Sequence, residues 1–155
     1  MKLTITISQF LLFLLCAELY AQNDSVLQQP VQFTPERIIW KEGPANLPKG
    51  VEMCLLYSNP KATGPFAARF KFPANYKLYA HYHENDEVVT VLEGSVFVGF
   101  GDKTDMSVAK EFKAGSFYVN PARSHHFVVI GKKGAVVQIN SVGPWTLEFI
   151  EKPRS

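Results

Sequence analysis

Two short segments of the chain hold all four of its histidines. The first, AHYHENDEVVTVLEG, carries His81 and His83 and, four residues later, Glu87. The second, GSFYVNPARSHHFVV, ends in an apolar run preceded by the pair His125 and His126. Imidazole nitrogens and a carboxylate, with no thiolate among them, are ligands that divalent transition metals accept. These two segments are therefore the candidates for a metal site.

Strand geometry decides which of these side chains can meet. Residues two apart in a β-strand project to the same face, so His81 and His83 share a face. Glu87 keeps the same parity if the strand continues through the turn residues before it. Adjacent residues face opposite sides, so only one of His125 and His126 can join the first pair, and alternation alone does not say which.

An isolated pair of strand histidines is more often a surface or core feature than a ligand pair, and a single strand-edge glutamate is usually solvated. The combination with a histidine on a distant strand favours a metal. Burying three neutral imidazoles and a carboxylate without partners costs several kcal/mol, because each polar group must be satisfied. One divalent ion satisfies all of them.

The rest of the chain supplies strands to position these residues. After a polar stretch of Gln, Asn, Asp, Ser and Pro come about ten short apolar or alternating runs separated by turn residues. Convincing ten-residue helical patterns and fixed-period repeats are lacking. The pattern predicts one all-β sandwich or barrel.

The two segments resemble the two motifs of the cupin superfamily. His81, His83, Glu87 and Gly94 match the first motif, and Gly115, Pro121 and His126 match the second. Two positions depart from the second motif: Arg123 replaces its glycine, and Ile130 replaces its asparagine. The resemblance extends over residues 66–150 and implies a double-stranded β-helix, or jelly-roll barrel.

The resemblance also implies ligands. It assigns His81, His83, Glu87 and His126 to one divalent transition metal per chain, which can be Fe, Mn, Ni, Zn or Cu. His125 then faces outward or steers its neighbour through a hydrogen bond. Gly94 and Gly115 are expected as turn glycines.

The walls of the pocket should be strand residues on the histidine face. Tyr79 and Phe97 are candidates by parity, with ordinary core packing as the simpler role for each aromatic ring. Parity leaves open one residue from each of three further pairs: Arg69 or Phe70, Phe117 or Tyr118, and Gln138 or Asn140. Arg123 either reaches a substrate carboxylate with its guanidinium or lies on a solvent-facing loop.

Two functions follow as hypotheses. The first is a metal-dependent enzyme of the dioxygenase type, acting on a small phenolic, diketone-like or carboxylate compound. The second is a non-catalytic cupin that binds a small molecule or metal as a sensor or scavenger. A general base beside the ligands is not evident, apart from Glu87 and His125.

The first residues of the chain and its net charge indicate where the protein is located and which partners it binds. Residues 1–21 have the charged start and apolar run of a signal peptide, which predicts export to the periplasm or medium and no membrane anchor after cleavage. Residues 22–36 are expected to form a flexible leader, and 37–152 a single cupin domain. The formal net charge of +2, with scattered lysines, does not favour nucleic-acid binding. By analogy with the fold we expect a homodimer.

Overall fold

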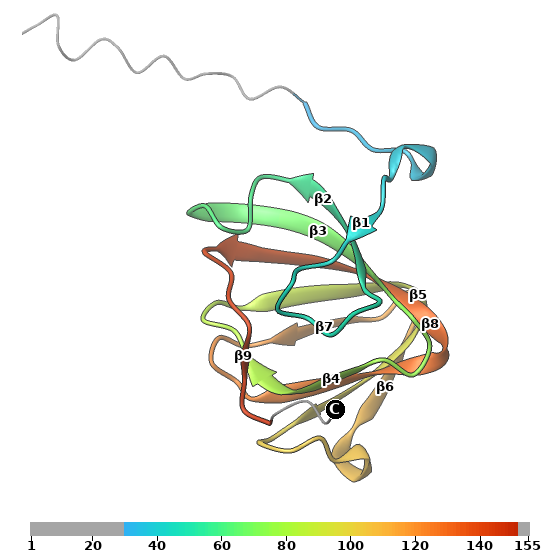
Figure 1. The fold of residues 1–155 in the computed structure, drawn as a ribbon, viewed down its shortest axis with the longest axis vertical. Helices are drawn as coiled ribbons and strands as arrows, with labels where there is room; N and C mark the ends of the chain where they lie inside the picture. Colours follow the sequence, from blue (N-terminus) through green and yellow to red (C-terminus); the bar gives the residue numbers. More distant parts are fainter. Residues whose placement is uncertain (1–29, 152–155) are drawn as a thin grey trace, which may run out of the picture. The chain divides into compact units, whose positions relative to one another are not determined.

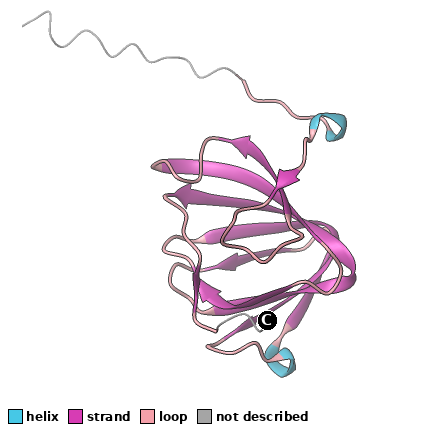
Figure 2. Cartoon of the chain, viewed as in Figure 1, coloured by secondary structure: helices cyan, strands magenta, loops and turns pink. Residues whose placement is uncertain are grey.

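The alternating apolar runs of the chain form a curled, strand-rich unit, shown as a ribbon in Figure 1 and by secondary structure in Figure 2. The computed structural model describes residues 30–151. The predicted signal peptide (1–21) and the first part of the predicted leader lie outside the described residues. Within 30–151, helices are limited to short turns that are neither long nor apolar enough to cross a membrane.

Nine strands and two 3₁₀ turns make up the described chain. In order they are η2 (Pro35–Arg37), β1 (Lys41–Glu42), β2 (Glu52–Tyr57), β3 (Gly64–Phe72), β4 (Lys77–Tyr82), β5 (Glu87–Phe100), η3 (Met106–Val108), β6 (Lys110–Lys113), β7 (Phe117–Asn120), β8 (His126–Gly143) and β9 (Glu148–Phe149).

Two long strands, β5 and β8, connect the two halves of the curled sheet. The second half of β8 pairs with β3 and with the first half of β5, and β2, β1 and β7 extend that half. The first half of β8 pairs with β4 and with the second half of β5, and β9 and β6 extend the other. All these pairings are antiparallel, as the predicted jelly-roll barrel requires.

Glycines allow the long strands to bend where the halves meet. Gly94 pairs with Ala135 at φ +69°, and the register of β5 shifts on both sides of it. The expectation that Gly94 ends a strand in a turn was wrong: β5 bends there and continues. Likewise β8 runs through Gly134, at φ +78°. Gly115, at φ +86°, does lie in a turn, between β6 and β7.

The concave side of the sheet holds one hydrophobic core. Val89 and Val91 from β5, Phe70 from β3 and Ile130 and Val137 from β8 are among its buried members. Because the core fills most of the barrel, the polar residues that share its interior stand in an apolar environment of low dielectric constant. That environment determines the chemistry of the histidine site.

Gly94→Ala tests whether the bend depends on close backbone contact. An added Cβ would lie 2.0 Å from the carbonyl oxygen of Gly134, on backbone at φ +69°. We expect a loss of about 3 kcal/mol in the free energy of unfolding, measured by urea denaturation. Gly115→Ala, with φ +86° and open space around the new methyl group, should cost only about 1 kcal/mol. Equal losses in both variants would contradict the close-contact argument.

Candidate metal centre

Three imidazoles meet at the inner face of the barrel. His81 lies near the end of β4, His83 follows that strand, and His126 begins β8. His81 and His126 are cross-strand partners in the β4–β8 pairing. Each histidine offers a ring nitrogen, and these nitrogens all lie within 4.8 Å of one another. All three side chains are buried, with relative exposures of 2% or less.

Backbone carbonyls orient every ring in this cluster. The Nδ1 atom of His81 lies 2.7 Å from the Tyr79 carbonyl oxygen, and that of His126 lies 2.9 Å from the Ser124 carbonyl oxygen. His83 Nδ1 lies 2.5 Å from the carbonyl oxygen of Thr146. Since a carbonyl only accepts, each Nδ1 must carry the proton. Each Nε2 therefore has its lone pair free, as in histidines that bind metals.

Two of the inward-facing ring nitrogens have no hydrogen-bond partner in the described part of the chain. Among the described residues, the Nε2 atoms of His83 and His126 are buried without a hydrogen bond. Burial lowers the pKa of His81 well below its ordinary value, and nearby His126 and His83 lower it further. Burial likewise lowers the pKa of His126, against the raising effect of Glu87. Neutral imidazoles with free lone pairs are metal donors.

Glu87 supplies a carboxylate beside this cluster. Its Oε1 lies 3.5 Å from His83 Nε2, and its Oε2 lies 3.8 Å from His126 Nε2. The Asn120 side chain donates a 2.8 Å hydrogen bond to Oε2, from the position opposite Glu87 in the β5–β7 pairing. Glu87 is only 6% exposed, so its negative charge lies in a low-dielectric interior.

The loop after β4, which carries His83, is tied to the loop before β8. The Arg123 backbone N–H donates to the His83 carbonyl at 2.7 Å, and the Ala122 N–H donates to the Asp86 carboxylate at 2.7 Å. Arg123 also pairs with Glu84 at 2.8 Å. Arg123 has φ +60°, so it adopts the left-handed backbone that the motif glycine normally supplies. These contacts offset the strain of a non-glycine residue there.

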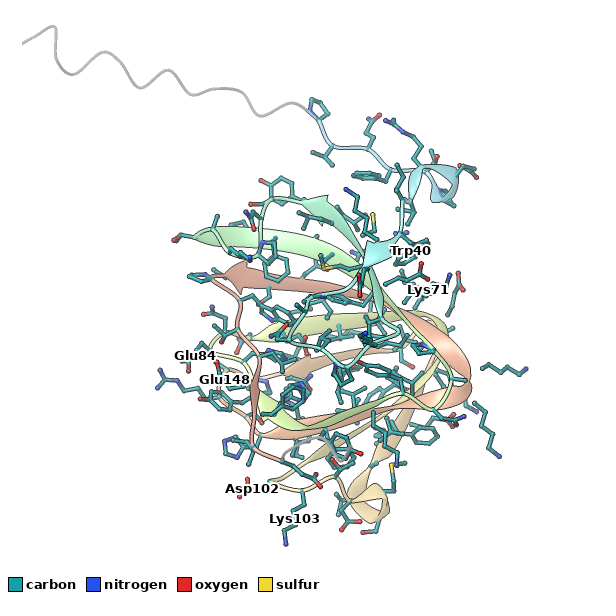
Figure 3. The ribbon with its side chains drawn as sticks, in the orientation of Figure 1. Trp40, Lys71, Glu84, Asp102, Lys103 and Glu148 are labelled. Atoms are coloured by element: carbon teal, nitrogen blue, oxygen red, sulfur yellow. The ribbon has the colours of Figure 1, made fainter. Side chains whose placement is uncertain are left out.

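Arg123 and His125 lie outside the histidine cluster. The Arg123 side chain is 76% exposed in its pair with Glu84. His125 bonds to Asp102 at 2.6 Å, and its ring lies 5.6 Å from that of Tyr82. Figure 3 labels the two acidic partners, Glu84 and Asp102, at the outer edge of the ribbon. Of the two positions expected for Arg123, the structure shows the solvent-facing one, and His125 takes the outward position of its pair.

A small cavity of about 30 Å³ adjoins the cluster. Its polar lining comes from His81, His83, Glu87, Tyr118 and Trp145, and the rest is aliphatic or aromatic. Lysine and arginine are absent from this lining within the described chain. Burial raises the pKa of Tyr118 far above its ordinary value, and the Glu87 charge adds to the effect, so the phenol keeps its proton.

Parity counting misplaced two of the predicted wall residues. The β4–β8 register shifts between Leu78 and His81, so Leu78 lines the cavity and Tyr79 does not. The shifts around Gly94 have the same effect in β5, where Val96 lines the cavity. Phe97 instead lines a separate hollow. A β-bulge inserts one residue and reverses the alternation beyond it.

The structure resolves the pairs that alternation left open. Phe70 and Tyr118 line the cavity. Arg69 hydrogen-bonds to Gln138 away from it, and Phe117 and Asn140 are exposed.

Three functional contributions were not predicted. Asn120 orients Glu87, the Thr146 carbonyl orients His83, and the Trp145 ring stacks on the His83 ring with centroids 4.7 Å apart. Asn120 has the parity of Tyr118 in a short strand, which was an available signal. A backbone carbonyl and a stacking ring from the distant C-terminal segment leave no trace in sequence spacing.

The donor set fits a divalent transition metal. Three buried imidazoles surround one place, the Nε2 atoms of His83 and His126 have no hydrogen bond there, and the carboxylate beside them lacks a cationic partner among the described residues. His81, His83 and His126 would hold the ion, with Glu87 as an oxygen ligand. The nitrogen and oxygen donors do not select one metal among Fe, Mn, Ni, Zn and Cu.

Comparison with known proteins agrees with this architecture. Residues 28–143 match the sequence model of the ChrR cupin-like domain. A search among curated proteins found no match.

Solved structures share the fold at low identity. The polyketide cyclase RemF from Streptomyces resistomycificus aligns with TM-score 0.65 and 18% identity, covering 81% of this chain and 89% of its own. An acetylacetone dioxygenase from Acinetobacter johnsonii aligns with TM-score 0.61 and 16% identity, and the alignment covers 81% of both chains. An RmlC-like cupin from Shewanella frigidimarina aligns with TM-score 0.57 and 20% identity, covering 74% of this chain and 91% of its own.

The adjacent histidines provide a matched test of the metal centre. We expect His126→Ala to reduce the affinity for a divalent metal more than about 100-fold, since it removes a direct ligand. His125→Ala should leave the affinity unchanged, because His125 faces Asp102 outside the cluster. Metal titration of both apo-proteins measures the difference. An equal effect of the two substitutions would contradict the assignment.

The buried histidines also predict a pH dependence of stability. His81 and His126 have lowered pKa values in the folded protein, whereas the unfolded chain binds protons with the ordinary pKa of about 6.5. Below that pH the unfolded state takes up more protons, so stability falls as the pH falls. The slope is at most about 1.4 kcal/mol per pH unit for each histidine.

Urea denaturation of the metal-free protein between pH 7.5 and 5.5 measures this slope. We expect His81→Gln to have a shallower slope and His125→Gln to retain the slope of the parent. A slope unaffected by His81→Gln would show that this histidine does not carry the effect.

Proposed function

The chain belongs to the ChrR cupin-like domain family, and on that premise we propose that it is a metal-dependent enzyme of the dioxygenase type. Its substrate is a small, largely apolar organic compound with one or two oxygen atoms able to bind a metal. The observation that carries this proposal is the cluster of three buried imidazoles, two of which line an apolar cavity.

Charge balance narrows the substrate class. A divalent ion with three neutral imidazoles and the Glu87 carboxylate has a net charge of +1. An enolate or phenolate brings the sum to zero, which a low-dielectric cavity favours. The lining lacks lysine and arginine, so a second carboxylate remote from the metal would be unpaired. Diketone-like and phenolic compounds are therefore preferred over polyanionic acids.

Different residues of the cavity have different roles in the proposed reaction. A redox-active ion bound here would supply Lewis acidity and electron transfer to dioxygen. The apolar walls exclude water and hold the substrate body. Tyr118 keeps its proton beside Glu87 and can donate a hydrogen bond to a substrate oxygen, while Asn120 holds the Glu87 carboxylate in place.

Known structures support the reaction class only through the fold. One aligned structure is an acetylacetone dioxygenase and another is a polyketide cyclase, both acting in this barrel architecture. Their identities of 16% and 18% do not transfer a substrate to this chain.

One observation favours the alternative function, a cupin that binds a small molecule or metal without turnover. The cavity of about 30 Å³ has room for little more than water, so an ion with a filled coordination sphere would also suit it. The export and homodimer predictions remain part of the proposal: export rests on the signal-peptide pattern of residues 1–21, and the homodimer on analogy with the fold.

Oxygen uptake separates the two functions. We expect the chain from Gln22 onward, loaded with Fe²⁺, to consume dioxygen with acetylacetone or small phenols, and the zinc form to be inactive. His126→Ala should lose the activity and His125→Ala should keep it. Binding of these compounds to the Fe²⁺ form without oxygen uptake would favour the non-catalytic function.

Tyr118→Phe tests the proposed hydrogen bond. We expect turnover to fall about 100-fold with unchanged metal content, the effect of removing one oriented donor. Phe117→Leu, in the same strand but 61% exposed, is the control and should retain activity. Full activity of Tyr118→Phe would remove the phenol from the mechanism.

A further inference from the structure

A second hollow lies directly behind the histidine cavity. It measures about 470 Å³ and is lined by the segment 42–46 and by residues of β2 and β3. Phe70 and Trp145 line both this hollow and the cavity. These two aromatic side chains therefore form a partition between the two spaces.

The outer hollow is suited to an apolar group. Met53, Phe66, Ala68 and Phe70 contribute its apolar lining, and its charged side chains are Glu42 and Lys61. By contrast, the inner cavity of about 30 Å³ is too small for a five-carbon diketone. A chelating ligand of the proposed class therefore needs more space than the inner cavity has, and movement of the aromatic partition would supply it.

Trp145 is the part of the partition that can move without loss of the backbone contact that orients His83. Its backbone N–H donates to the Pro60 carbonyl at 2.7 Å, so the chain is anchored there. The next residue, Thr146, holds His83 through its carbonyl oxygen. A rotation of the Trp145 side chain would leave both backbone contacts in place.

Aromatic contacts hold the indole ring. It stacks on His83 at an interplanar angle of 17°, and it meets Phe66 edge-on at a centroid distance of 6.0 Å. The buried Nε1 atom lacks a hydrogen-bond partner among the described residues. Rotation of the ring therefore breaks no polar contact.

We propose that the outer hollow is the second half of the ligand site, and that Trp145 is the side chain displaced when a ligand enters. The inference rests on the proposed function of the histidine cavity. It specifies a two-part ligand: a small oxygen-chelating head at the histidines and an apolar, preferably aromatic, body in the outer hollow. Ligands that bind in this way are larger than the volume of the inner cavity alone would allow.

Two diketones that differ at one end test this inference. Acetylacetone carries a methyl group where benzoylacetone carries a phenyl group. With Zn²⁺ added to prevent turnover, we expect benzoylacetone to bind at least 10-fold more tightly by calorimetry, because its phenyl group is buried in the hollow.

Met53→Glu, which places a charge in the outer hollow, should abolish this preference. Met106→Glu makes the same change at a different hollow and should retain the preference. Asn46→Trp, on an exposed part of segment 42–46, fills the outer hollow independently of Met53 and should also abolish it.

Fluorine NMR of protein labelled with 5-fluorotryptophan reports on the ring itself. The chain has two tryptophans, so Trp40→Phe leaves the Trp145 resonance alone. We expect this resonance to shift when either diketone binds. Binding without a shift, or a phenyl preference that survives both hollow variants, would overturn the two-part site and leave the proposed function standing. Absence of any diketone binding would overturn both.

Discussion

The hydrogen bonds from three Nδ1 atoms to backbone carbonyls are the constraint on which the site depends. They set one tautomer in His81, His83 and His126 and turn three lone pairs toward one place. Two of the carbonyls belong to the residue two positions before the histidine, so local backbone supplies them. The third, from Thr146, comes from the C-terminal segment, which makes the chain's end part of the metal centre.

The curled sheet brings these carbonyls and rings together. The long strands β5 and β8 contribute to both halves of the barrel, and the close approach at Gly94 and Gly134 allows them to bend. One end of the bent pair carries His126, and the other carries Glu87. The loops that follow β4 and precede β8 are joined by Arg123 and Asp86. The pairing of the strands thus fixes the distances between the donor side chains, and the loop contacts hold them further in place.

An apolar interior gives this polar cluster its reactivity. Burial lowers the pKa of His81 and His126, keeps the Tyr118 phenol protonated, and leaves the Glu87 charge without a protein cation among the described residues. Each of these would be costly in a core without an ion, because isolated charges and lone pairs are poorly solvated there. The aromatic partition around Trp145 then determines how much of the interior a ligand can reach.

The sequence by itself determined the all-β class, the cupin resemblance and the residues that meet at the histidine cluster. Strand alternation and motif spacing are local features of the chain, so they can be recognised without knowing the fold. It did not determine which neighbours face the cavity, since bulges near Leu78 and Gly94 reverse the alternation for Tyr79 and Phe97. Nor did spacing indicate Trp145, Thr146 or the outward pairing of Arg123 with Glu84. Those contacts join segments far apart in the chain, so only the tertiary structure decided them.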